Sequence, residues 1–220
     1  MAQQAQLQWR DGGVPVSTRF DDPYFSLENG LDETRHVFLG GNDLPGRLCD
    51  GFHIAELGFG TGLNLLATLE AWDERPGTFR YTSFEAYPMG RDDMARALSA
   101  FAGIGPFADL LLAAWREEGG EMQVGPARLE VVVGDARETL PGWQGAADAW
   151  YLDGFSPAKN PELWQPELMA DVAAHTAPGG TAATYTAAGF VRRGLDAAGF
   201  DVERVPGYGR KRHMTKARLR

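Results

Sequence analysis

Four acidic residues stand at or just after short, mostly apolar segments that have the composition of buried strands. They are Glu56, Glu85, Asp135 and Asp153. A carboxylate accepts hydrogen bonds from hydroxyl and amine groups and can take up a proton. Four such groups at strand ends predict a ligand site with acceptors already in position.

A glycine-rich turn follows the first of these acids. A short run ends at Leu57, glycines occupy positions 58, 60 and 62, and a helix-like leucine pattern begins at Leu63. Glycine permits a sharp turn and a close approach of backbone to ligand, and the free N–H groups of the helix start face that ligand. The spacing G-x-G-x-G is tighter than the dinucleotide fingerprint G-x-G-x-x-G. With an acid two residues before the first glycine, it favours S-adenosylmethionine, which has no pyrophosphate. The alternative is a purely structural turn. The expected cofactor-binding residues here are Glu56, Gly58, Gly60, Gly62 and Asn64.

Two further acids fit the same cofactor. Glu85 ends a predicted strand about 23 residues after Gly62, where an acid can accept hydrogen bonds from both ribose hydroxyls. It could instead be a surface glutamate. Asp135 follows the next strand and could accept from the adenine amine, or cap the turn that follows it. Both roles of Asp135 are compatible.

The loop that begins at Asp153 is the most specific stretch of the chain. It reads Asp-Gly-Phe-Ser-Pro-Ala-Lys-Asn-Pro over residues 153–161. A carboxylate there can orient an amine and take its proton, and Phe155 can pack the acceptor in place, while prolines stiffen the loop. We therefore expect an N-methyltransferase with Asp153 as its catalytic residue. Lys159 and Asn160 either contact the substrate or cap and close the loop, and the two interpretations are equally open.

Composition narrows the class of protein. The chain has 220 residues, 44% of them hydrophobic and 23% charged, with one cysteine and four scattered histidines. These values are ordinary for one globular domain, and they exclude an internal disulfide and a cysteine-based metal site. No apolar run approaches the roughly 20 residues of a membrane helix, and the first residues do not resemble a signal peptide. We expect a cytoplasmic protein that binds no metal and no membrane.

The charge is distributed unevenly. The net charge of −9 argues against broad, non-specific binding of nucleic acid. The segment from Arg204 to the end nevertheless has seven basic residues and no acidic one, and Arg192 and Arg193 lie just before it. A local basic surface could hold a phosphate backbone, or it could be a solvated strand.

The order of elements predicts an α/β fold. We expect strands at 53–57, 79–85, 129–133, 147–152, 181–186, 200–205 and 212–219. Helices are expected at about 62–73, 88–101, 106–118, 161–176 and 187–198. This alternation favours a mostly parallel sheet covered on both faces, with an antiparallel pair at one edge. It matches the seven-stranded, Rossmann-like class I S-adenosylmethionine-dependent methyltransferase sheet. We assign this domain to residues 51–220, and residues 1–50 to an N-terminal extension that packs on it. In the extension we expect a turn and an edge strand within 12–17, a loop at 21–26 and a short helix or extended piece at 33–39.

Several stretches together resemble the tRNA 5-methylaminomethyl-2-thiouridine methyltransferase family, the MnmC-type methyltransferase domain. The main ones are residues 59–64, 152–161 and 184–195. Shorter ones are residues 24–26, 33–34, 37–44 and 207–212, so the resemblance covers nearly the whole chain. It implies methylation of the primary aminomethyl group at carbon 5 of the tRNA wobble uridine, with S-adenosylmethionine as donor. Some members are fused to a FAD-dependent oxidoreductase that unmasks the same amine. At 220 residues we expect a stand-alone methyltransferase that takes its substrate from another wobble-uridine enzyme.

The resemblance also implies a tRNA-binding surface. The wobble base lies in a single-stranded loop, so it can be splayed out and stacked on aromatic residues. Tyr24, Phe25 and Phe155 are candidates for stacking, although each could be a core residue. The C-terminal basic region, including Lys211 and Arg212, is expected with Arg192 and Arg193 to hold phosphates of the anticodon arm.

Three other functions remain open at this stage. A methyltransferase for a small-molecule or protein amine would share the same cofactor residues. A non-enzymatic binding module is disfavoured because a decayed site would not need four acids at strand ends. A dinucleotide oxidoreductase is disfavoured by the glycine spacing and by the antiparallel edge pair.

Overall fold

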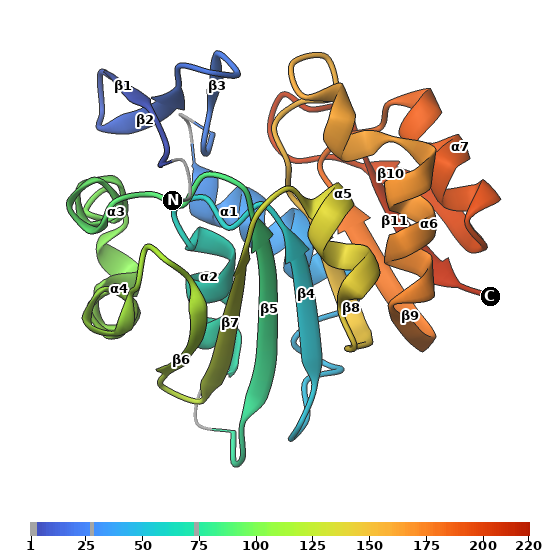
Figure 1. The fold of residues 1–220 in the computed structure, drawn as a ribbon, viewed down its shortest axis with the longest axis horizontal. Coiled ribbons are helices and arrows are strands. Elements are labelled where there is room, and N and C mark those ends of the chain that lie inside the picture. The colour runs from blue at the N-terminus through green and yellow to red at the C-terminus, as the bar shows by residue number, and fades with distance from the viewer. Residues whose placement is uncertain (1–3, 27–28, 73–74) are drawn as a thin grey trace.

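An eight-stranded mixed sheet forms the centre of the computed structural model, which describes residues 4–26, 29–72 and 75–220 (Figure 1). The strand order is β10-β11-β9-β8-β4-β5-β7-β6. The five inner strands β9, β8, β4, β5 and β7 are parallel, whereas β6, β11 and β10 pair antiparallel at the two edges. The strands are β4 (His53–Leu57), β5 (Phe79–Glu85), β6 (Gly120–Val124), β7 (Ala127–Val133), β8 (Ala147–Leu152), β9 (Thr176–Thr184), β10 (Phe200–Pro206) and β11 (His213–Leu219).

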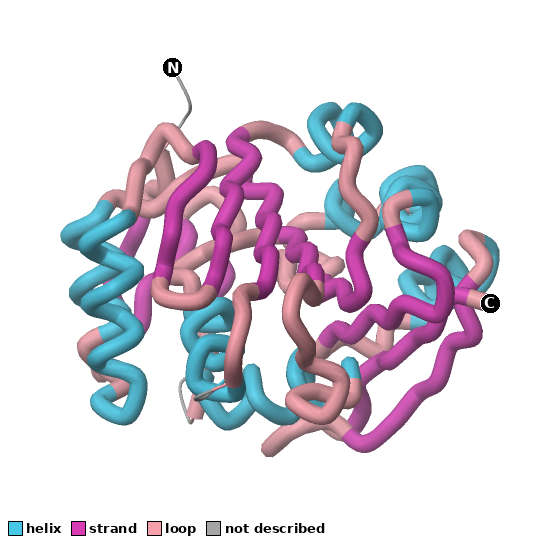
Figure 2. Tube along the Cα trace, turned by 90° about the horizontal axis from the view of Figure 1, so that it is seen from below, coloured by secondary structure: helices cyan, strands magenta, loops and turns pink. Residues whose placement is uncertain are grey.

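The hydrophobic core consists of two clusters, one on each face of the sheet. Ile54 and Tyr151 belong to one cluster, while Leu57 and Trp150 belong to the other. Successive side chains of a strand point to opposite faces, so each central strand contributes to both clusters. Helices lie on both sides of the sheet (Figure 2). They are α2 (Leu63–Trp72), α3 (Arg91–Leu98), α4 (Gly105–Ala114), α5 (Ala136–Thr139), α6 (Pro166–Ala174) and α7 (Gly189–Ala197), with short helical turns η3 (Ala102–Ile104), η4 (Leu140–Gly142) and η5 (Pro161–Trp164).

The N-terminal residues add a second, smaller sheet. Its strands are β1 (Leu7–Arg10), β2 (Val14–Ser17) and β3 (Asp22–Pro23), and they pair antiparallel in chain order. The helical turns α1 (Gly30–Thr34), η1 (Arg35–Leu39) and η2 (Gly40–Asn42) follow. Val14, Phe25 and Phe38 join the same hydrophobic cluster as Ile54. The N-terminal segment is therefore packed into the core of the larger sheet.

The predicted α/β fold is confirmed, with differences in detail. The sheet has eight strands because residues 120–124 form β6, a hairpin partner of β7 in which Met122 and Val124 are buried and Glu121 and Gln123 are exposed. The predicted helix at 161–176 is divided into η5 and α6, since Pro166 lacks the N–H that a continuous helix requires. β9 begins at Thr176 and runs through the Pro-Gly-Gly expected to separate helix from strand. Residue 73 of the predicted helix at 62–73 lies outside the described residues.

In the described part of the chain, no single helix is long and apolar enough to cross a membrane. The pair Arg91–Leu98 and Ala102–Ala114 meets the length and composition requirement together, but it is bent by 117°.

Candidate functional site

A cavity of about 1260 Å³ opens at the carboxyl ends of β4, β5, β7 and β8. In the strand order, β4 lies between β5 and β8. The chain continues from β4 to β5 and β7 on one side of the sheet, and then returns to β8 and β9 on the other side of β4. Ligands of open α/β sheets bind in the crevice at this point. Of the predicted site residues, the cavity lining includes Tyr24, Phe25, Gly58, Gly60, Asn64, Glu85, Asp135, Asp153, Phe155, Asn160 and Lys211. It does not include Glu56, Gly62, Lys159, Arg192, Arg193 or Arg212.

The glycine turn joins β4 to α2 with left-handed backbone at each of its three glycines. The φ angles are +89° at Gly58, +54° at Gly60 and +77° at Gly62. A Cβ atom on Gly58 would lie 2.8 Å from the backbone oxygen of Asp153, and one on Gly62 would lie 2.6 Å from Leu111 Cδ2. Gly58 therefore lets the turn meet the Asp153 loop, while Gly62 lets the start of α2 pack on α4.

Glu85 is tied to the same turn. Its Oε2 accepts a hydrogen bond from Gly60 N at 3.0 Å, and its Oε1 accepts one from Tyr87 N at 2.7 Å. Burial raises the pKa of this carboxyl group above its ordinary value, and the backbone N–H groups oppose that effect. Each carboxylate oxygen has a second lone pair, so Glu85 can also accept from a ligand in the cavity.

Asp135 caps the N-terminus of α5. Its Oδ1 accepts from Arg137 N at 3.0 Å, which is the capping interaction considered from the sequence. Its Oδ2 also pairs with Arg137 Nη2 at 2.6 Å. This guanidinium group lowers the pKa of Asp135. The residue is a charged acceptor at the edge of the cavity.

Asp153 is held by an amide from the other side of the turn. Asn64 Nδ2 donates to Asp153 Oδ2 at 2.7 Å. Burial raises the pKa of Asp153 to about 7, while the hydrogen bond from Asn64 and the charge of Lys211 act in the opposite direction. The group can therefore change its protonation state near neutral pH.

Glu56 lies behind this pair and is completely buried. Its Oε1 accepts from Asn64 Nδ2 at 2.8 Å, and its Oε2 accepts from Ser83 Oγ at 2.9 Å. Thr34 Oγ1 donates to Asn64 Oδ1 at 3.0 Å, so the amide of Asn64 is engaged at both ends. Burial raises the pKa of Glu56 to about 8. Glu56 and Asn64 thus form a polar support beneath Asp153.

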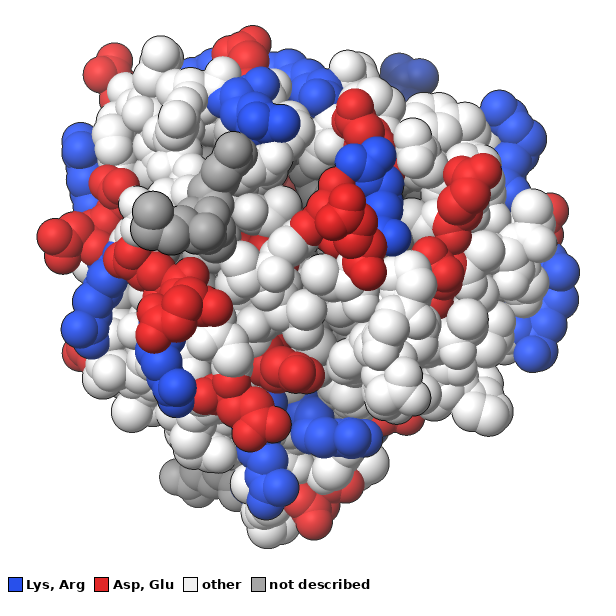
Figure 3. Space-filling model, in the orientation of Figure 1, with Lys and Arg blue, Asp and Glu red and all other residues white. Residues whose placement is uncertain are grey.

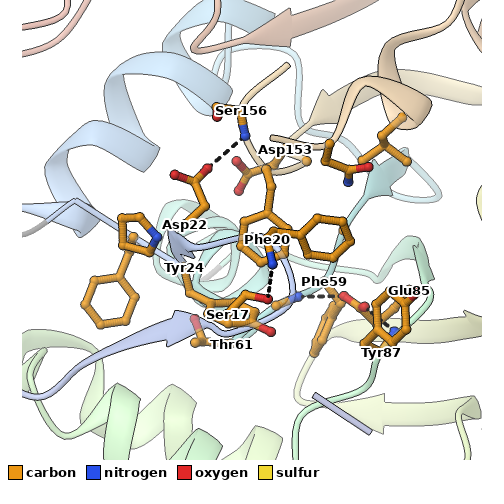
Figure 4. Close-up of a pocket in the computed structure, with 18 of the residues that line it drawn as sticks. Ser17, Phe20, Asp22, Tyr24, Phe59, Thr61, Glu85, Tyr87, Asp153 and Ser156 are labelled. Carbon is orange, nitrogen blue, oxygen red and sulfur yellow. Dashed lines mark hydrogen bonds between the residues drawn. The ribbon is translucent and has the colours of Figure 1, made fainter. Parts of the chain in front are cut away.

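The N-terminal sheet supplies contacts to the Asp153 loop that the sequence did not reveal. Asp22 Oδ2 accepts from Ser156 N at 2.8 Å, and Figure 4 shows the Asp22 carboxylate pointing at this amide. Lys159 Nζ lies 3.4 Å from Asp22 Oδ1 and from Asp21 Oδ2. These contacts are of the loop-closing kind, which is one of the two roles considered for Lys159. Asn160 N donates to Ser156 O at 2.9 Å, within the same loop.

Aromatic side chains line the cavity between the two sheets. Phe155 stacks on Phe20, with ring centroids 4.9 Å apart, and meets Tyr24 edge-on at 5.1 Å. Phe20 also contacts Tyr87, so an aromatic row connects the Asp153 loop to the end of β5 (Figure 4). Phe25 packs against Phe101 and is only 9% exposed. Its main contacts are those of a core residue.

Several of the C-terminal basic residues are engaged in ion pairs. Ion pairs join Lys211 to Glu33, Lys216 to Glu203, Arg218 to Asp43, and Arg220 to Asp196 and Asp201. Arg192 Nε donates to Ala187 O. On the face shown in Figure 3, basic and acidic side chains are intermingled. Among the described residues, no group of three or more His, Cys, Asp or Glu side chains could hold a metal ion.

The chain matches a known family and several known proteins. Residues 106–220 match the family described as S-adenosyl-L-methionine-dependent methyltransferase. The chain is 46% identical over 231 residues to the tRNA 5-methylaminomethyl-2-thiouridine biosynthesis bifunctional protein MnmC of Aeromonas salmonicida, covering 94% of this chain and 34% of that protein. It is 48% identical over 221 residues to the MnmC protein of Caulobacter vibrioides, covering 96% and 37%. The chain thus spans about a third of these relatives' length.

A solved structure has the same architecture. The crystal structure of MNMC2 from Aquifex aeolicus superposes with a TM-score of 0.80 at 25% identity, covering 99% of this chain and 71% of that one. The predicted resemblance to the MnmC-type methyltransferase domain is thereby confirmed.

Proposed function

The chain belongs to the S-adenosyl-L-methionine-dependent methyltransferase family, and we propose that it methylates the aminomethyl group of 5-aminomethyluridine, or of its 2-thio form, at the tRNA wobble position. The product is the 5-methylaminomethyl nucleoside. One observation carries the proposal: the Asp153 carboxylate lines the cavity and is held by Asn64 beside the glycine turn. The name of the MnmC relatives, which concerns 5-methylaminomethyl-2-thiouridine in tRNA, supports the choice of substrate.

The residues present fit S-adenosylmethionine. The left-handed glycines Gly58 and Gly60 keep side chains away from the cavity floor, and Glu85 brings two acceptor oxygens to the same turn. We assign the ribose hydroxyls to Glu85 and the adenine amine to Asp135. We assign Glu56, Gly62 and Asn64 to the shape of the cradle. Glu56 and Gly62 are not part of the cavity lining, and Asn64, which is, binds Glu56 and Asp153.

Asp153 acts on the substrate nitrogen. When bound, S-adenosylmethionine supplies a sulfonium methyl group, whose carbon–sulfur electrons stay on sulfur as the nitrogen lone pair forms the new bond. The amine must be neutral to attack, and one proton leaves nitrogen in the reaction. Asn64 holds Asp153 Oδ2, so Oδ1 can accept a hydrogen bond from the amine and orient its lone pair. With a pKa near 7, the carboxylate can also accept the proton at neutral pH.

We further propose that the tRNA approaches by its anticodon arm, in the cytoplasm, after an upstream enzyme has produced the amine. Tyr24 and Phe155 would stack on the base, with Asn160 nearby, and phosphates would lie along Arg192, Arg193 and Arg212. Residues 1–50 would act as an extension of the methyltransferase domain rather than as a separate unit. The shared hydrophobic core and the contact between Asp22 and Ser156 support this assignment.

The test is methyl transfer from labelled S-adenosylmethionine to bulk tRNA from cells that lack this gene, with nucleosides identified by mass spectrometry. Conversion of 5-aminomethyl to 5-methylaminomethyl uridine is the expected result. Cofactor binding without transfer to tRNA would reject the substrate.

A methyltransferase for a small-molecule or protein amine is the second candidate. It is favoured by the ion pairs of the C-terminal basic residues, which reduce the charge offered to a phosphate backbone. Activity on tRNA that falls steeply with salt would count against it, because phosphate contacts are salt-dependent.

A further inference from the structure

Lys211 extends into the cavity from the loop that joins β10 to β11. Its ammonium nitrogen lies 2.6 Å from Glu33 Oε1 and 4.3 Å from the centre of the Tyr185 ring. Glu33, Tyr185 and Lys211 all line the same cavity as Asp153. The Glu33 side chain is only 11% exposed, so this carboxylate faces the interior of the site rather than open solvent.

The partners of the Lys211 ammonium are the two groups that proteins use to bind such a cation. A carboxylate attracts it as the opposite charge of an ion pair, and the face of an aromatic ring attracts it through the ring quadrupole. A lysine side chain ends in a methylene group and a primary ammonium group, as does a protonated aminomethyl substituent. Most aminomethyl groups are protonated at neutral pH if their pKa is like that of lysine.

The ammonium position is also linked to Asp153. Tyr185 Oη donates to Gly154 O at 2.7 Å, which ties the ring to the residue next to Asp153. The charge of Lys211 lowers the pKa of Asp153, and the charge of Glu33 raises it. A cation that replaced Lys211 between Glu33 and Tyr185 would therefore lie in the same cavity as Asp153, the proposed acceptor of the substrate's proton, and would act on its pKa as Lys211 does.

We propose that Glu33 and Tyr185 form the docking site for the primary ammonium group of the substrate, and that Lys211 fills this site until the substrate displaces it. The proposal rests on the proposed function, since it takes the substrate to be a primary amine. The displaced Lys211 would move away with its loop, and its positive charge would then lie outside the ammonium site.

Equilibrium binding of two amines to the full chain tests the site without requiring turnover. The probes are 5-aminomethyluridine and n-butylammonium, and 5-methyluridine is the neutral control. Lys211→Met should bind both amines about tenfold more tightly than the wild type, because the internal competitor is gone. Glu33→Gln should bind both about tenfold more weakly. Binding of 5-methyluridine should change in neither variant.

The variants are first checked for wild-type melting and for binding of S-adenosylhomocysteine. If Glu33→Gln does not fold, Lys211→Met alone decides. Unchanged or weaker amine binding by Lys211→Met would overturn the proposal. Unchanged binding would mean that Lys211 does not compete with the amine, and weaker binding would mean that Lys211 contacts it directly.

The outcome is separable from that of the proposed function. Suppose that the wild-type protein does not methylate tRNA, but that Lys211→Met binds n-butylammonium more tightly than the wild type and Glu33→Gln binds it more weakly. The ammonium site then stands and the tRNA substrate is rejected. If tRNA is methylated but Lys211→Met gains no affinity for either amine, the ammonium site fails and the function stands.

Discussion

Asn64 Nδ2 lies 2.7 Å from Asp153 Oδ2 and holds the loop acid from the first turn of α2. The same nitrogen lies 2.8 Å from Glu56 Oε1. One amide therefore connects a buried acid of β4 to the acid that lines the cavity. Because the amide oxygen of Asn64 accepts from Thr34, the side chain has little freedom to turn. This relationship fixes where the Asp153 carboxylate points.

Replacing Asp153 should reduce turnover far more than cofactor binding. We expect Asp153→Ala and Asp153→Asn to lower kcat by about 10²–10⁴-fold, the usual range for a lost general base. The wild-type rate should rise as the pH increases through about 7, because Asp153 must be ionised to accept a proton. Steady-state kinetics and titration of S-adenosylhomocysteine measure the two effects. A parallel loss of turnover and of cofactor affinity would contradict the assignment.

Removing the amide of Asn64 should change the position and the pKa of the Asp153 carboxylate while leaving the carboxylate itself in place. Asn64→Ala should lower kcat by about tenfold, and Asn64→Asp should move the pH–rate profile to higher pH, since a third nearby carboxylate raises the pKa of Asp153 further. The matched control is Thr68→Val, a buried change one turn along α2 that removes a hydrogen bond to Asn64 O. It should lower the melting temperature but leave the pH profile in place. An unshifted profile for Asn64→Asp would show that Asn64 does not tune Asp153.

Glu56 should make the protein less stable as the pH rises. Its pKa is about 8 in the folded chain against 4.5 for the ordinary group, so between these values the folded state keeps a proton that the unfolded state releases. Stability therefore falls with pH across this window, by on the order of 1 kcal/mol per pH unit. Glu56→Gln carries no such proton, and its free energy of unfolding should depend less on pH in urea titrations from pH 5 to 9. The exposed Glu167→Gln variant should keep the wild-type slope. Equal slopes for all three proteins would mean that Glu56 is ionised in the fold.

Four of the five inner strands were predicted well, because burial makes them rich in apolar, aromatic and β-branched residues, whereas β9 begins at Thr176, five residues before its predicted start. Four predicted strands end where the structure ends them, at Leu57, Glu85, Val133 and Leu152. The edge strand β6 was missed because only Met122 and Val124 of it are buried, and because the Gly119-Gly120 pair at its start resembles a loop. At α6, Pro166 gave a local signal of a break that the prediction did not use.

The cradle was easier to predict than the groups that complete the site. Glycine spacing and acids at strand ends are local patterns, and they pointed to Gly58, Gly60, Glu85 and Asp153, all of which line the cavity. Asp22 contacts Ser156 across 134 residues of sequence, and nothing near Asp22 indicates that partner. The charge count of the C-terminal segment likewise gave no sign that Lys211 pairs with Glu33 inside the cavity. Such pairings are set by tertiary packing.

The contact between Asp22 and Ser156 should restrain the Asp153 loop. Asp22→Asn keeps the size of the side chain but weakens the charge-assisted hydrogen bond to the amide. We expect the Ser156 amide to exchange its hydrogen about tenfold faster and kcat to fall severalfold, measured by hydrogen exchange and kinetics. Asp21→Asn is the control, because the Asp21 side chain is 84% exposed and pairs with the flexible end of Lys159. If both variants behave alike, the restraint comes from Lys159 rather than from the Ser156 amide.

A side chain on Gly58 should separate the glycine turn from the Asp153 loop. An alanine there would adopt a φ of +89° and bring its Cβ to 2.8 Å from Asp153 O. Because this oxygen belongs to the backbone, it cannot move aside as the end of a flexible side chain could. Gly12→Ala is the matched control, since Gly12 has a φ of +82° and an added Cβ meets nothing within 4 Å. The left-handed conformation alone should destabilise either variant by about 1 kcal/mol. The contact with Asp153 should add about 1–3 kcal/mol to Gly58→Ala. Chemical denaturation measures these costs, and titration of S-adenosylhomocysteine should show weaker binding only for Gly58→Ala. An equal loss of stability in both variants, together with wild-type cofactor binding, would contradict this prediction. It would mean that the Asp153 loop can shift away from Gly58 without changing the cofactor site.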